Sequence, residues 1–93
     1  MKNLNWSKQA GNHPADAPAV MRLLRSRRTR AYYTGHGWAR EPHRAKSFPN
    51  EFDAVREYLD KRLSDQAMKD VELVLRWAQS DYDLLAVPLL RHE

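Results

Sequence analysis

The sequence predicts an α+β fold: a four-stranded antiparallel sheet, in the order β-β-α-β-β, with one main helix packed on one face. Three observations support this. Apolar residues recur every three or four positions after Asn50, they alternate along Val71–Trp77, and an aromatic-rich run spans Ala31–Trp38. The first spacing is typical of an amphipathic helix, and the other two patterns are typical of strands. A chain of 93 residues forms one domain at most.

Residues 1–18 are predicted to form a flexible N-terminal arm, and residues 19–93 the single α+β domain. The arm contains Gly11, Pro14 and several Asn, and shows no apolar period. A segment of this composition buries too little apolar surface to order itself. Trp6 is the exception, because an aromatic side chain in a polar tail can dock onto a surface.

A first hairpin is expected after the arm. Residues 19–27 fit a helical face and a strand equally well. The context favours a strand, because the run Ala31–Trp38 follows almost at once and is rich in Tyr and Thr, which suit a pleated surface. Gly35 and Gly37 indicate a bulge or bend near the end of this second strand.

The helix is predicted to begin at Asn50, a good N-cap, with Asp53 at the third helical position. Its apolar face is expected to comprise Phe52, Val55, Leu59 and Leu63 and to be buried. The helix ends near Ser64 or continues through Met68, and the sequence does not decide between these two end points.

One cluster of Trp38, Ala45 and Phe48 is expected to anchor the loop before the helix.

A second hairpin is predicted from Val71–Trp77 and Tyr82–Val87, with Pro88 suited to a strand end. The alternate apolar residues of the first of these strands are expected to face the helix. The residues expected on the other face of the sheet are Val74, Leu85, Val87 and Leu89. A second copy of the chain or the N-terminal arm would then cover that apolar surface.

Charge is distributed unevenly along the chain. Between Arg22 and Lys46 there are eight basic residues and one acidic residue, whereas six basic and ten acidic residues follow from Asn50 onward. Arginine makes bidentate contacts with phosphate, and aromatic side chains stack on unpaired bases. The candidate polyanion-binding residues are Arg22, Arg25, Arg27, Arg28, Arg30, Tyr32 and Trp38. The alternatives are a solvated hairpin whose aromatic side chains fill the core, arginines that pair with the acidic helix and with Asp81 and Asp83, and a surface for an acidic protein partner.

Several other activities lack the residues that they require. The absence of Cys excludes disulfides, zinc–thiolate sites and thiol catalysis. His36 and His43 have no recognised metal-ligand spacing, and the glycines around His36 do not form a phosphate-binding loop. The serines have no elbow motif and no paired His. The sequence therefore indicates no enzyme, no metal site and no cofactor.

The sequence also predicts a cytoplasmic protein that makes no contact with a membrane. No apolar run approaches the roughly 20 residues of a membrane span. The N-terminal stretch lacks the apolar core of a signal peptide.

One pattern of residues covers about positions 20–88. It consists of Tyr32-Tyr33-Thr34-Gly35-x-Gly37-Trp38, then Ala45-x-x-Phe48, then Glu51 and Ala54 in a helix, then Val71-Glu72-Leu73-Val74-Leu75. This pattern resembles that of small uncharacterised bacterial and phage proteins. The resemblance implies the fold, but it implies no activity and no functional residue.

These observations favour a small non-enzymatic binding module. Its partner is expected to be a protein, including a second copy of the same chain. Nucleic acid, bound through the arginine cluster, is the alternative partner.

Overall fold

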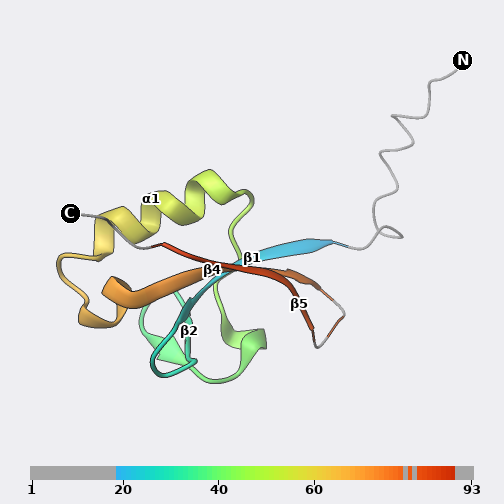
Figure 1. The fold of residues 1–93 in the computed structure, drawn as a ribbon, viewed down its shortest axis with the longest axis horizontal. Coiled ribbons are helices and arrows are strands. Elements are labelled where there is room, and N and C mark those ends of the chain that lie inside the picture. Colours follow the sequence, from blue (N-terminus) through green and yellow to red (C-terminus); the bar gives the residue numbers. More distant parts are fainter. Residues whose placement is uncertain (1–18, 79, 81, 90–93) are drawn as a thin grey trace, which may run out of the picture.

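The computed structural model describes residues 19–78, 80 and 82–89, so the predicted arm at 1–18 lies outside the described residues. The fold is α+β, with one α-helix and an open antiparallel sheet in the order β3-β2-β1-β4-β5 (Figure 1). The strands are β1 (Val20–Ser26), β2 (Tyr32–Tyr33), β3 (Trp38–Ala39), β4 (Val71–Trp77) and β5 (Asp83–Pro88). The helices are α1 (Glu51–Lys61) and the short 3₁₀ helices η3 (Pro42–Arg44) and η4 (Gln66–Asp70).

The sheet has five strands instead of the predicted four, because the second predicted strand is divided in two. A tight turn separates β2 from β3. The Thr34 hydroxyl accepts hydrogen bonds from the backbone N–H groups of His36 and Gly37, and Gly35 has a φ of 100°. Glycine adopts this left-handed conformation at little cost. The bend expected at the glycines therefore reverses the chain and creates an additional strand.

The predicted start of the main helix is confirmed. Asn50 is the N-cap, and its side-chain oxygen accepts a hydrogen bond from the backbone N–H of Asp53 at 2.8 Å. This contact satisfies one of the N–H groups that have no partner in the first helical turn. The helix ends at Lys61, and Met68 belongs to the separate 3₁₀ helix η4.

The predicted burial of the apolar helix face is wrong. Ala54 and Tyr58 are the buried residues of α1, whereas Phe52 and Leu59 are exposed and Val55 is half-buried. Exposed Leu63 lies two residues beyond the end of the helix. The apolar period therefore marks a surface stripe.

Two polar contacts, one on either side of Ala54, explain why the helix is rotated about its axis so that its apolar stripe faces away from the core. Arg22 of β1 forms an ion pair with Glu51 at 3.3 Å. On the other side of the helix, the Tyr33 hydroxyl of β2 donates a hydrogen bond to Glu57 at 2.6 Å. Together they direct Ala54 toward the sheet, where a methyl side chain allows close approach.

The core beneath α1 is filled largely by side chains from outside the helix. Its buried members are Leu24, Tyr33, Phe48, Ala54, Tyr58, Met68, Val71 and Leu73, and Trp38 and Leu89 pack against them. Phe48 and Met68 come from the segments before and after the helix. They fill the space beneath the helix that the sequence pattern predicted to be filled by the apolar stripe of α1.

The predicted cluster of Trp38, Ala45 and Phe48 is confirmed only for its aromatic pair. Trp38 packs against the cluster that contains Phe48. Ala45 instead packs on the other side of the sheet, against a second cluster formed by Leu23, Tyr32 and Val74. The loop before the helix therefore contributes to both faces of the sheet.

Four residues were predicted to lie on the sheet face away from the helix, and this prediction is wrong for three of them. Val74 lies on the face away from the helix, as expected, in the cluster with Leu23. Leu85 and Val87 pair with Leu75 and Leu73 of β4. Paired residues of antiparallel strands share a face, and Leu73 belongs to the core beneath α1.

Leu85 and Val87 therefore lie on the helix side of the sheet. Leu89 packs against that same core. The cause is a register shift between Leu75 and Arg76, where β5 carries an extra residue.

Candidate interaction surface

The main exposed apolar feature of the described residues is a stripe along α1. Phe52 is 68% exposed, Leu59 is 46% exposed, and Leu63, just beyond the helix, is 80% exposed. The guanidinium of Arg56 lies 5.9 Å from the centre of the Phe52 ring and covers part of it. Single exposed apolar residues are ordinary, but several on one stripe are typical of an interaction site.

A second apolar feature lies on strand β5. This strand is the last in the sheet order, and every one of its residues is exposed. Leu85 is 51% exposed and Val87 is 41% exposed, although both lie on the side of the sheet that carries α1. The sequence Leu84–Pro88 contains no charged residue.

Helix geometry directs the stripe on α1 toward the β4–β5 side of the sheet. Successive residues are rotated by about 100° around a helix. Glu57 contacts Tyr33 of β2 and so marks the flank nearest β2. Phe52 and Leu59 lie on the opposite flank. Both features lie on the side of the sheet that carries α1, and we name them together the α1–β5 surface, which comprises Phe52, Leu59, Leu63, Leu85 and Val87.

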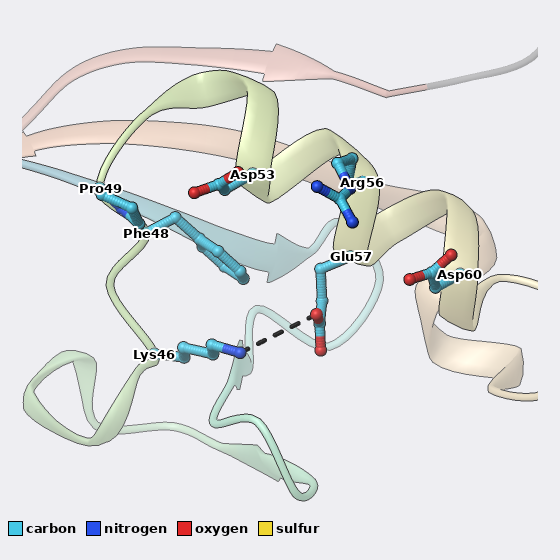
Figure 2. A pocket seen from close by; sticks show the side chains of 7 residues that line it. All are labelled: Lys46, Phe48, Pro49, Asp53, Arg56, Glu57 and Asp60. Atoms are coloured by element: carbon cyan, nitrogen blue, oxygen red, sulfur yellow. Dashed lines mark ion pairs between the residues drawn. The ribbon is translucent and has the colours of Figure 1, made fainter.

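The flank of α1 that faces β2 is hollowed, and it is polar (Figure 2). The hollow has a volume of about 320 Å³ and is lined by Lys46, Phe48, Pro49, Asp53, Arg56, Glu57 and Asp60. The carboxylate of Glu57 lies 3.8 Å from the ammonium of Lys46. Lys46 also lies 5.1 Å from the centre of the Phe48 ring. Acidic and basic groups thus both line this hollow, and Glu57 and Lys46 pair within it.

Within that hollow, Glu57 has a structural partner in Tyr33. Burial, together with the hydrogen bond to Glu57, raises the pKa of Tyr33 well above its usual range. The hydroxyl therefore stays protonated and donates to Glu57 at neutral pH. A carboxylate held in this way secures the helix to the sheet.

The structure divides the seven candidate polyanion-binding residues into a buried and an exposed group. Arg25 is only 5% exposed, and Tyr32 is buried beside it. Trp38 is half-buried, and its indole N–H donates to Asp65 at 3.0 Å. Arg27, Arg28 and Arg30 remain exposed on the turn after β1, while Arg22 is half-buried against Glu51.

Arg25 is at the centre of a network on the face of the sheet away from α1. Its Nε donates to Glu72 at 2.7 Å, and its Nη1 donates to Asp83 at 2.8 Å and to the Tyr32 hydroxyl at 3.2 Å. Arg30 also donates to Glu72, at 3.1 Å. Burial alone would lower the pKa of Arg25, but these hydrogen bonds outweigh it and raise the pKa above its usual range.

The buried ion pair was not predicted, although the sequence carried a signal for it. Glu72 is the one acidic residue in the apolar strand Val71–Trp77, and Arg25 lies between apolar and small residues of β1. The two residues pair directly across β1 and β4. A charge in each of two buried strands indicates a buried pair, because a lone buried charge is too costly.

The histidines do not meet to form a metal site. His36 and His43 are both exposed. Within the described parts of the chain, no three residues among His, Asp and Glu are placed to hold a metal ion. Among the same residues, no helix is long and apolar enough to cross a membrane.

Comparison with known proteins gives no relative: the chain matches no protein-family model, no curated protein and no solved structure.

Proposed function

We propose that this chain is a small binding module that docks onto another protein chain through the α1–β5 surface. The observation that supports the proposal is that Phe52, Leu59 and Leu63 are exposed on the same side of the sheet as an edge strand that carries no charge from Leu84 to Pro88. A free sheet edge presents unpaired N–H and C=O groups, and an extended chain can add to it as a further strand. An apolar helix flank beside that edge adds area to such a contact.

Site-specific photo-crosslinking tests this proposal. Leu63, the most exposed apolar residue of the α1–β5 surface, is replaced by p-benzoylphenylalanine, and the full chain is irradiated in a cell extract. We expect crosslinks to protein, including other copies of the chain. The matched control carries the same replacement at Arg28, on the turn after β1, and is expected to give at least about tenfold less crosslinked product.

The pair of substitutions Phe52→Ser and Leu59→Ser extends this test. Both side chains are exposed, so the far-ultraviolet circular dichroism spectrum should stay unchanged while the crosslinks from position 63 disappear. Equal crosslinking from positions 63 and 28, or crosslinks that survive both substitutions, would contradict the proposal.

Nucleic-acid binding is the second candidate, and the exposed turn carrying Arg27, Arg28 and Arg30 favours it. Arg27 and Arg30 each pair with an acidic residue, at 3.5 Å and 3.1 Å, so the net positive charge of this turn is small. Arg25 is removed from the candidate contacts by its burial.

We expect no binding of a single-stranded DNA 20-mer at micromolar protein in about 0.15 M salt, where the Debye length is about 8 Å. Fluorescence anisotropy measures this directly. Binding that persists at this salt and falls with Arg27→Ala and Arg28→Ala would support nucleic acid instead, because phosphate contacts release condensed counterions. The same two changes test the turn without disturbing the buried Arg25.

A further inference from the structure

Among the described residues no strand pairs with the outer edge of β5, and this edge has a self-complementary pattern of hydrogen-bonding groups. The backbone N–H of Leu89 donates to the carbonyl of Val71, so residue 89 directs its backbone groups toward β4. Successive residues of a strand direct these groups to opposite sides. The groups of Val87 therefore also face β4, and those of Ala86 and Pro88 face outward. Pro88 has no N–H, so Ala86 offers both a donor and an acceptor at the free edge.

Two copies of this edge can pair antiparallel about Ala86. When a two-fold axis passes through Ala86, the N–H of each Ala86 donates to the carbonyl of the other copy's Ala86. A register shifted by two residues would place Pro88 opposite Ala86, and one carbonyl in each copy would then have no donor. In the register centred on Ala86, Pro88 instead lies opposite Leu84, so the missing N–H affects an outer pair and the central pair of Ala86 residues keeps both hydrogen bonds.

The side chains agree with that register. Leu85 of one copy lies opposite Val87 of the other, on the side of the sheet that carries α1. No charge lies between Leu84 and Pro88 to oppose the pairing. Asp83 shares a face with its partner Arg76, away from α1, and it is compensated by ion pairs with Arg25 and Arg76 at 2.8 Å and 3.2 Å. Like charges on opposing strands are destabilising, and this strand avoids them.

The area that a stable dimer interface must bury indicates that α1 also takes part in the contact. A standard specific interface buries about 800 Å² per partner. One added edge strand supplies only part of that area. The stripe of Phe52 and Leu59 lies on the flank of α1 away from β2 and is exposed. Two-fold pairing of β5 places the stripes of both copies along one continuous apolar surface.

From these observations we propose that the partner is a second copy of this chain, paired antiparallel through β5 about Ala86. The two five-stranded sheets then form one continuous sheet. This pairing uses the α1–β5 surface, and the inference therefore rests on the proposed function. An isologous contact of this kind closes as a dimer and does not propagate into a fibre.

Sedimentation equilibrium combined with amide hydrogen exchange tests the dimer. We expect the full chain to sediment as a dimer at about 100 μM, with slow exchange of the Ala86 amide. In a single chain no described residue accepts a hydrogen bond from that amide, so fast exchange is expected, whereas the Val87 amide faces β4 in both states. Slow exchange at Ala86 therefore reports this edge contact specifically.

Val87→Lys is the disrupting variant, and Gln66→Lys, on exposed η4, is the matched control of equal charge. Val87→Lys should weaken dimerisation at least about 100-fold and restore fast exchange at Ala86, with the Val71 to Trp77 amides still protected. The control should change neither quantity. A dimer whose Ala86 amide exchanges quickly would overturn the proposal, as would a dimer unaffected by Val87→Lys.

The outcomes also separate this inference from the proposed function. A monomer that still crosslinks to another protein from position 63 would overturn the second copy and leave the binding function in place. A monomer whose Ala86 amide is protected would overturn it in favour of a segment of the same chain beyond residues 19–89. A monomer that neither crosslinks nor protects Ala86 would overturn both.

Discussion

Replacing Glu72 with leucine is expected to lower the free energy of unfolding by about 3–5 kcal/mol, because it removes the more buried of the two carboxylates that pair with the guanidinium of Arg25. The side chain of Arg25 is 7% exposed and that of Glu72 is 9% exposed, so water cannot replace the lost partner. A domain of this size shifts its Tm by about 4–8 °C for each kcal/mol. Thermal and urea unfolding followed by circular dichroism should therefore show a Tm lower by more than about 12 °C.

Two further variants identify the cause of that loss. Arg25→Met combined with Glu72→Leu should be more stable than Glu72→Leu alone, because an apolar pair of similar volume can replace a buried ion pair. Glu41→Gln removes one partner of the exposed pair between Arg44 and Glu41 and should cost at most about 1 kcal/mol. If Glu72→Leu costs no more than Glu41→Gln, the Arg25–Glu72 pair is not desolvated.

The parts of the fold that the sequence predicted are those fixed by local chemistry. The N-cap at Asn50 depends on a side chain that bonds its own helix. Strand β4 depends on strict alternation, and the predicted bounds of Val71–Trp77 are those observed. The bend at Gly35 depends on a backbone conformation that suits glycine. Each of these features is determined within a few residues, so no knowledge of the partner segments is required.

The parts that were wrong depend on contacts between distant segments. The rotation of α1 is set by the contacts of Glu51 with Arg22 and of Glu57 with Tyr33, which lie 24 or more residues apart in the chain. The space beneath the helix is filled by Phe48 and Met68, so the apolar stripe is not needed there. A periodic apolar face shows that a helix has a preferred side, and the rest of the chain decides whether that side faces the core or a partner.

The position of the exposed apolar surface was predicted wrongly. An unpaired apolar surface was expected on the sheet face away from the helix, and the structure shows one on the helix side. The register shift beside Leu75 changes which residues of β5 face the helix, and such a shift has no strong sequence signature. The arginine cluster was treated as one surface, although strand alternation places Arg25 on the face away from α1, where it contacts Glu72.

The rotation of α1 gives the second large expected effect. Tyr58→Ala should lower the free energy of unfolding by about 3–5 kcal/mol, the range for truncating a buried aromatic side chain, because Tyr58 is 5% exposed in the core beneath the helix. Leu59→Ala, at the next position, should cost less than about 1 kcal/mol in the single chain, because Leu59 is already 46% exposed. Urea denaturation of both variants measures the difference.

This comparison has to be made where self-association contributes nothing. A ligand or second copy that binds only the folded chain raises its apparent stability, so loss of an interface residue would resemble loss of a core residue. Both changes are therefore introduced into the Val87→Lys chain at low micromolar concentration. In the unmodified chain at about 100 μM, Leu59→Ala should show an additional loss of stability that Tyr58→Ala does not. A cost for Leu59→Ala equal to that for Tyr58→Ala in the Val87→Lys chain would mean that the apolar stripe packs into the core, and that the α1–β5 surface is not available to a partner.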